Sequence, residues 1–295
     1  MKNAIIFIFL LSLTKMFAQD QQITANIFET NTLPEVVVVG ETKLSEEAKI
    51  GPYSQPEWTY RRRFSTTRVY VQKEPWQAGV EQWWRGRFYK DGSASHLLQE
   101  EFEIGLPHRF QFDLYENWIV DKQGIAHHHD VATELRWALA DWGKIPLNPT
   151  IYGEWKSVDK NQGPDVYEFK LLFGEELMPD LHWGLNVIYE QEVGGERATE
   201  MAWSQGFSYA LIDSKFSAGL EMSFKHETTK FSRSEPEIKF SLGPSFQWRP
   251  TPRTHLDIVP LFGLTKDAPS VEAFLVFGYD FGKPGSYSPS SLKGQ

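Results

Sequence analysis

The stretch Ile238–Phe281, IKFSLGPSFQWRPTPRTHLDIVPLFGLTKDAPSVEAFLVFGYDF, decides the fold of this chain. Its apolar residues recur at every second position in three runs, which are separated by the turns RPTPR and KDAPS. In the last run Leu275 and Phe277 share one parity, whereas Glu272 and Asp280 share the other. A period of two indicates β-strands, because successive side chains point to opposite faces. One apolar and one polar face over about 10 residues is typical of strands that span a membrane in a β-barrel.

The same alternation extends over most of the chain from Val80 onward. Together with the three runs above, it predicts about twelve strands that are joined by hairpins. The other expected strands are Val80–Tyr89, Leu97–Leu106, Arg109–Val120, Val131–Leu139, Pro149–Trp155, Val166–Phe173, Leu181–Tyr189, Glu200–Leu211 and Phe216–Phe224. We therefore predict an all-β fold, a closed antiparallel up-and-down transmembrane barrel over residues 80–281 with an irregular N-terminal arm.

Composition narrows the class of protein. The 295 residues carry a formal net charge of −9, which argues against nucleic acid as a partner. The chain contains no Cys, so disulfides, thiolate metal sites and a lipoprotein anchor are excluded.

The N-terminus indicates the compartment. A short positive start, an apolar run that is too short to cross a bilayer as a helix, and the sequence Phe17-Ala18-Gln19 together predict a signal peptide over residues 1–18. A secreted barrel of this kind belongs in a bacterial outer membrane, with both termini in the periplasm. The expected organisation is a signal peptide (1–18), a periplasmic arm (19–79), the barrel (80–281) and a flexible polar tail (282–295).

The arm contains the run LPEVVVVG at residues 33–40, in which Glu35, Val36, Val37, Val38 and Val39 form a short acidic-then-valine segment. This segment resembles the TonB box of TonB-dependent outer-membrane receptors. The resemblance implies that it adds as a strand to the sheet edge of a periplasmic TonB-like partner. The globular plug domain of those receptors is missing, because too few residues separate the segment from the first barrel strand. The alternative is a short strand that lies against a neighbouring segment or the barrel.

A second resemblance covers most of residues 97–281. The acidic strand, GLPHR turn and FQFDL run at residues 100–114 are similar to outer-membrane proteins grouped as "MetA pathway of phenol degradation" transporters. The closing runs at residues 243–252, 263–269 and 277–281 look like the end of the same group. The resemblance implies an outer-membrane barrel with a role in uptake, and it assigns no site residue.

The polar parity of the strands predicts which side chains line the lumen. Acidic residues outnumber basic ones there by roughly two to one. The residues expected to set selectivity are Glu101, Glu103, Asp113, Glu134, Arg136, Glu154, Glu168, Lys170, Glu190, Glu221, Lys239, Asp257 and Glu272. Further charged residues of this parity are Glu81, Arg85, Arg87, Lys156, Glu200, Lys225 and Asp280. An uncompensated acidic lumen would favour cations, whereas charges that pair across it would close the barrel.

Three consecutive arginines in the arm, Arg61, Arg62 and Arg63, form a basic cluster in this acidic protein. One hypothesis is that they enter the lumen as a small plug and neutralise its acidic excess. The alternative is a solvated periplasmic face, or a contact with anionic lipid headgroups.

The sequence offers little that suggests catalysis. His127, His128, His129 and Asp130 form its densest cluster of possible metal ligands, and we interpret them as an exposed strand end. The lipid-facing parity shows no Ser and His pair of the kind that an outer-membrane lipid hydrolase needs. We expect no enzyme, no cofactor and no metal.

The leading functional prediction is a channel for passive uptake of small apolar or cationic solutes. The second is a closed structural barrel whose arm docks a periplasmic protein, and the third is a lipid-modifying enzyme. The expected partners are outer-membrane lipid and the barrel assembly machinery.

Overall fold

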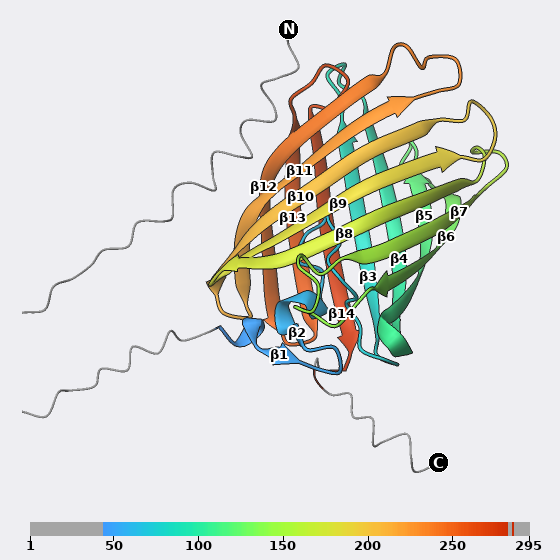
Figure 1. Cartoon of the computed structure of the whole chain (residues 1–295). Coiled ribbons are helices and arrows are strands. Elements are labelled where there is room, and N and C mark those ends of the chain that lie inside the picture. Colours follow the sequence, from blue (N-terminus) through green and yellow to red (C-terminus); the bar gives the residue numbers. More distant parts are fainter. Residues whose placement is uncertain (1–43, 283–284, 286–295) are drawn as a thin grey trace, which may run out of the picture. The chain divides into compact units, whose positions relative to one another are not determined.

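The computed structural model describes residues 44–282 and Gly285. Within them, twelve antiparallel strands form a closed barrel in which each strand pairs with its sequence neighbours and the last pairs with the first (Figure 1). The strands are β3 (Ala78–Phe88), β4 (Ala94–Leu106), β5 (Phe110–Val120), β6 (Ala126–Ala138), β7 (Thr150–Val158), β8 (Val166–Met178), β9 (Leu181–Glu192), β10 (Thr199–Ile212), β11 (Phe216–Thr228), β12 (Glu237–Thr251), β13 (Thr254–Gly263) and β14 (Val271–Phe281). The predicted fold class is confirmed.

Several strands are longer than the alternation of apolar residues predicted. β6 begins at Ala126 instead of Val131, and β11 continues to Thr228 instead of Phe224. Apart from Ala126, these extra residues are polar on both faces, so they carry no period-two signal. Backbone hydrogen bonding continues between neighbouring strands beyond the apolar belt, because pairing depends on the main chain and not on side-chain polarity.

The two faces of the wall differ as the parity predicted. Outward side chains such as Phe102, Leu171 and Phe277 are exposed by 40%, 48% and 49%, whereas inward ones such as Glu103 and Arg136 are fully buried. Exposed apolar side chains on every strand form a belt that suits the hydrocarbon of a membrane. None of the helices in the described residues is long and apolar enough to cross a membrane.

The two ends of the barrel are built differently. We call the end where β3 begins and β14 ends the terminal end, and the opposite one the loop end. Most turns at the terminal end are short, including the 3-10 helix η4 (Pro107–Arg109) between β4 and β5. Residues 139–149 are the exception at this end, and the backbone N–H of Trp142 donates to the carbonyl oxygen of Tyr53 at 3.0 Å. This longer loop packs against the arm.

Residues 44–77, which we call the arm, fold against the inner wall at the terminal end (Figure 1). They contain the 3-10 helices η2 (Ser45–Glu47) and η3 (Glu57–Tyr60) and a small sheet of β1 (Lys49–Ile50) with β2 (Gln55–Pro56). Trp58, Phe64 and Val71 of the arm are buried, so the arm supplies much of the apolar interior. Residues 67–73 of the arm form no strand, and the backbone N–H groups of Arg68 and Gln72 donate to side chains of the wall there.

Three sequence predictions fall mainly outside the described residues. These are the signal peptide (1–18), the valine-rich segment (33–40) and the polar tail (282–295), of which only Gly282 and Gly285 are described.

Candidate functional site

The lumen is the candidate site, because the charged residues of the chain converge there. The structure places every residue that the sequence assigned to selectivity on the inward face of its strand. The buried ones are Glu101, Glu103, Asp113, Glu134, Arg136, Glu168, Glu221, Asp257 and Glu272, and those of intermediate burial are Glu154, Lys170, Glu190 and Lys239.

Eight of the lumen carboxylates stand in register on eight consecutive strands. Each is the direct cross-strand partner of the next, in the order Glu103, Asp113, Glu134, Glu154, Glu168, Glu190, Glu200 and Glu227. Glu103 is three residues from the terminal end of β4, and Glu227 is one residue from the loop end of β11. Because barrel strands are tilted by about 40°, the row climbs around the wall from one end to the other. We call it the carboxylate row.

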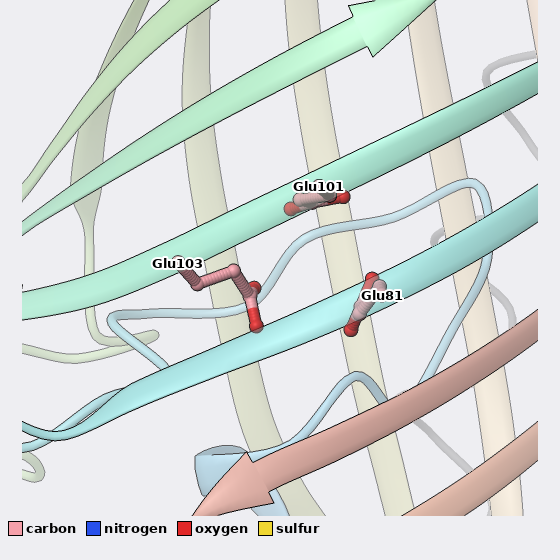
Figure 2. Close-up of side chains that lie close together, drawn as sticks. All are labelled: Glu81, Glu101 and Glu103. Carbon is pink, nitrogen blue, oxygen red and sulfur yellow. The ribbon is translucent and has the colours of Figure 1, made fainter.

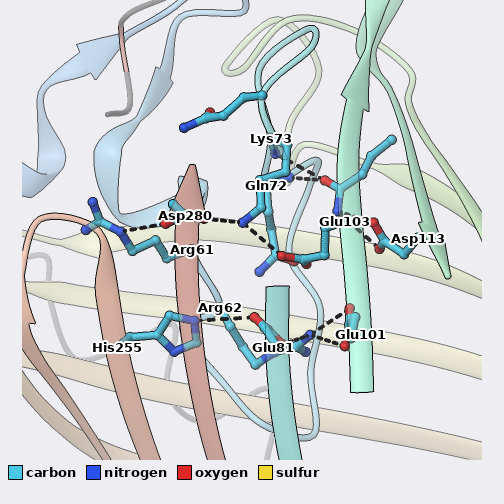
Figure 3. Close-up of polar contacts among 12 residues, drawn as sticks. Arg61, Arg62, Gln72, Lys73, Glu81, Glu101, Glu103, Asp113, His255 and Asp280 are labelled. Carbon is cyan, nitrogen blue, oxygen red and sulfur yellow. Dashed lines mark hydrogen bonds and ion pairs between the residues drawn. The ribbon is translucent and has the colours of Figure 1, made fainter. Parts of the chain in front are cut away.

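The arm brings cations to the lower part of this wall (Figure 3). Arg61 Nε donates to Asp280 Oδ2 at 3.2 Å. Arg62 Nε donates to Glu81 Oε2 at 2.7 Å, and its Nη2 lies 3.3 Å from Glu101 Oε2. Arg63 faces a different acid, since its Nη2 lies 2.9 Å from Oε1 of Glu46 in the arm itself. Two of the three arginines therefore bind barrel carboxylates, and the third is neutralised within the arm.

Two further arm cations make contacts that sequence reasoning missed. Arg68 Nη2 lies 2.9 Å from Glu101 Oε1. Lys73 Nζ bridges two strands, at 2.9 Å from Glu103 Oε2 and 2.7 Å from Asp280 Oδ1 (Figure 3). Neither cation belongs to a recognisable cluster, and only the folded arm brings them to the wall.

Glu81, Glu101 and Glu103 are the one group of metal-capable side chains in the described residues whose ligand atoms lie close together, all within 4.8 Å (Figure 2). They project from the neighbouring strands β3 and β4. Arg62, Arg68 and Lys73 contact these carboxylates, so cations of the arm stand where an ion would otherwise be held. The histidines at the loop end bind separate acids, His127 with Asp121 at 2.9 Å and His129 with Asp130 at 2.5 Å.

Polar groups of the wall also bind the backbone of the arm. Glu221 accepts hydrogen bonds from the backbone N–H groups of Ser65 at 3.1 Å and Thr66 at 2.7 Å. Asn186 pairs with Arg68 in both directions, accepting from its N–H and donating to its carbonyl oxygen, each at 2.7 Å. Because irregular backbone can be buried only where such partners exist, the wall and the arm are complementary.

Three inward-facing glycines make room for the arm. Gly174 on β8, Gly184 on β9 and Gly206 on β10 are direct cross-strand neighbours. A Cβ at Gly206 would overlap the ring of Phe64, and one at Gly184 would lie 2.7 Å from a methyl group of Val69. Without side chains at these positions, the wall has a shallow track across three strands that seats the arm.

The start of the arm is anchored to the turn between β10 and β11. The carboxylate of Asp213 accepts hydrogen bonds from the backbone N–H groups of Ser45 at 2.9 Å and Glu46 at 3.2 Å. Partial burial by itself would raise the pKa of Asp213, but these hydrogen bonds outweigh it and lower the pKa below its ordinary value. The ionised carboxylate therefore holds the arm at the terminal end.

Above the arm the lumen is open. A lower cavity of about 380 Å³ has Arg62, Ser65, Thr66 and Arg68 of the arm among its lining residues. An upper cavity of about 440 Å³ reaches the loop end. Nine residues line both cavities, so the two form one vestibule: Arg85, Arg87, Lys156, Val166, Glu190, Glu200, Ser223, Lys225 and Glu272. The barrel is thus hollow toward the loop end and filled by the arm toward the terminal end.

The lipid-facing wall is less uniformly apolar than the sequence suggested. Glu100 and Glu116 are direct cross-strand partners on the outward face, and both are exposed. Gln82 is the partner of Glu100 on the other side. The strand register shifts beside this position, between Asn117 and Trp118. Such a shift is typical of a β-bulge, which changes the direction of neighbouring side chains.

Comparison with known proteins shows the fold. No protein-family model matches the sequence, and no curated protein is similar to it. The COG4313 outer membrane channel from Pseudomonas putida F1 aligns with 70% of this chain and 96% of its own, at 9% identity and a TM-score of 0.54. The NanC porin aligns with 70% of this chain and 99% of its own, at 14% identity and a TM-score of 0.49. The chain therefore has the fold of bacterial outer-membrane β-barrels. Membership of the phenol-degradation transporter group stays a prediction.

Proposed function

We propose that this protein is an outer-membrane channel whose own arm closes the lumen at the terminal end, and that displacement of the arm opens it. The observation that carries the proposal is the set of ion pairs from Arg62, Arg68 and Lys73 to carboxylates of the barrel wall. A barrel of twelve strands is wide enough to need such a filling if it is to be closed. The solved channel with the same fold is consistent with this function.

The proposed orientation follows from the two ends of the barrel. Short turns are usual on the periplasmic side and longer loops outside, so the terminal end faces the periplasm and the vestibule opens outward. The valine-rich segment 33–40 belongs to the predicted arm 19–79 and comes shortly before its described part, residues 44–77. A periplasmic TonB-like partner that paired with it would pull on the arm through the chain itself.

Opening would change the charge of the lumen. Displacement of the arm removes Arg61, Arg62, Arg63, Arg68 and Lys73. Glu81, Glu101, Glu103 and Asp280 of the wall then lose their nearest arm cations. A pore with an acidic wall favours cations, so the open channel would pass small cations as the sequence led us to expect.

The test is single-channel conductance of the refolded chain in planar bilayers. Deletion of residues 55–73 should give steady conductance that is much larger than that of the full chain. Equal conductance of the two proteins, with both shown to be folded, would overturn the proposal.

A reversible lock tests the same idea without a deletion. A Cβ at Gly174 would lie 3.3 Å from Val69 Cβ, near the separation of about 3.5–4.5 Å found in disulfides. Because the chain has no Cys, the double variant Val69→Cys and Gly174→Cys contains one possible disulfide. Oxidation should suppress openings induced by voltage, and a reductant should restore them. The matched control is Val69→Cys alone, which should respond to neither reagent.

The second candidate is a permanently closed barrel with a structural or docking role. It is favoured by the burial of Arg61, Arg62 and Lys73. Moving these residues away from the wall would break buried ion pairs with its carboxylates, which is costly. On this alternative, the deletion variant conducts but the full chain never opens, even when tension is applied to its N-terminus.

A further inference from the structure

We propose that the lower cavity contains a binding site for a small organic monocarboxylate, centred on Arg85. This inference rests on the proposed function only in that the vestibule is open to the outside. It concerns the closed state of the protein, with the arm in place.

Although Lys156 alone serves three carboxylates, Arg85 is, among the described residues, the one cation without an ion-pair contact in the lower cavity. Every carboxylate that lines it contacts a basic side chain. The pairs are Asp130 with His129 at 2.5 Å, Glu154 with Lys156 at 3.3 Å, Glu168 with Lys156 at 3.3 Å, Glu190 with Lys156 at 2.7 Å, Glu200 with Lys225 at 2.9 Å, and Glu272 with Arg87 at 2.7 Å. The remaining lining cations apart from Arg85 are paired too, Arg62 with Glu81, Arg68 with Glu101 and Lys170 with Glu168.

Arg85 has no such partner. Among the described residues, no hydrogen bond or ion pair at contact distance joins its guanidinium to an acceptor. The side chain lines both cavities, so a solute in the vestibule can reach it. The neighbouring Arg87 is already held by Glu272, and its positive charge adds to that of Arg85. A guanidinium presents parallel N–H donors that match the two oxygens of a carboxylate.

The residues around Arg85 favour a ligand that carries a single negative charge on an apolar body. Trp83, Leu97 and Phe274 line the lower cavity beside Arg85. Phe274 is the direct cross-strand partner of Arg85, and Leu97 is its partner on the other side. Glu190 and Glu200 line the same cavity, so a dianion would meet repulsion that a monoanion largely avoids. At about 380 Å³ the cavity falls within the usual size range of small-molecule sites, roughly 300–1,000 Å³.

The test is isothermal titration of the full refolded chain in detergent with benzoate, which carries the expected charge on an aromatic body. Benzamide has nearly the same shape without the charge, and phthalate carries two charges. We expect benzoate to bind more tightly than either. In Arg85→Gln its affinity should fall at least about tenfold, because a charge-assisted hydrogen bond is lost. The matched control is Arg233→Gln, which removes an exposed arginine of the loop between β11 and β12 and should leave the affinity unchanged.

Each contrary result has a definite meaning. If Arg85→Gln binds benzoate as tightly as the native chain, the site is not at Arg85. If benzamide binds as well as benzoate, the cavity selects apolar bodies and not carboxylates. If neither benzoate nor hexanoate binds at millimolar concentration, the proposal is wrong. Conductance is not measured in any of these titrations, so failure of the proposed channel would show separately.

Discussion

At the scale of single residues, Lys73 illustrates how the arm and the barrel depend on each other. Its ammonium group lies between Glu103 of β4 and Asp280 of β14, and all three side chains are buried. A buried charge is stable only while its partner is present. Lys73 therefore joins the arm to two strands that are far apart in sequence and separated by β3 in the barrel.

Replacing Lys73 should be costly. Lys73→Met leaves the buried Glu103 without its nearest cation, whereas Asp280 keeps Arg61. Because breaking a buried ion pair is costly, we expect a loss of about 3–5 kcal/mol in the free energy of unfolding. Urea unfolding in detergent measures it. Lys266→Met, at a lysine whose side chain is 90% exposed, is the matched control and should change stability by less than about 0.5 kcal/mol. Equal effects of the two substitutions would contradict the role of Lys73.

Asp213 provides a pH-dependent anchor. The pKa of Asp213 is lowered in the folded state. Its contribution to the free energy of unfolding is therefore present above the ordinary pKa of about 4 and is lost as the pH falls through the lower pKa of the folded state. We expect Asp213→Asn to unfold at a lower urea concentration than the native chain at pH 7. The difference should be smaller at pH 2. A difference that is the same at both pH values would show that the anchor does not depend on the charge.

At the scale of elements, the glycine track of β8, β9 and β10 determines whether the arm fits. Gly206→Val should expel Phe64 from its seat, because the added side chain occupies the space of the ring. We expect a higher open probability in bilayers. Adding Phe64→Ala to Gly206→Val restores the space, so the double variant should conduct less than Gly206→Val alone. If the second substitution only increases conductance further, the track does not seat the arm in this way.

The lipid-facing carboxylates Glu100 of β4 and Glu116 of β5 lead to a prediction of increased stability. Glu100 and Glu116 are like charges placed directly opposite each other, an arrangement that destabilises a sheet, and carboxylates are unfavourable within an apolar belt. Glu116→Leu should therefore raise the unfolding temperature in lipid vesicles. Glu235→Leu in an exposed loop is the control and should leave it unchanged. A lower unfolding temperature for Glu116→Leu would mean that something covers these carboxylates in the membrane.

At the scale of the whole molecule, the lumen is a balance between an acidic wall and a basic arm. The carboxylate row runs almost the full height of the barrel, and the arm neutralises its lowest part. Lysines that lie between the carboxylates, such as Lys156 and Lys225, do the same higher up. The arm thus supplies both apolar filling and positive charge to the terminal end of the barrel.

This balance predicts the selectivity of the open state. In a gradient of KCl, the variant that lacks residues 55–73 should show a reversal potential on the cation side. It keeps the acidic wall and loses five arm cations, namely Arg61, Arg62, Arg63, Arg68 and Lys73. Adding Glu101→Gln and Glu103→Gln to the deletion should weaken the preference. A preference for anions in the deletion variant would contradict the assignment of an acidic pore.

Sequence periodicity was sufficient for the wall. In Val271–Phe281 each residue faces the side that its parity indicates. Successive side chains of a barrel strand alternate between the lipid and the lumen, so parity alone assigns each side chain to one of the two. The polar ends of β6 and β11 were not predicted, because a strand with polar residues on both faces shows no alternation of apolar and polar residues. The lumen-facing positions of Glu134 and Arg136 followed from the same parity.

What the sequence determined by itself was thus the local pattern: twelve alternating strands, which face of each is apolar, and an acidic interior. Only the tertiary structure decided how the strands align and where the arm lies. The register of the strands places the carboxylates side by side on eight of them. This register depends on pairing between strands, which the pattern within a single strand does not specify. The contacts of Lys73 with Glu103 and Asp280, and of Phe64 with Gly206, join residues up to 207 positions apart. They exist because the closed barrel encloses a space that the arm can fill.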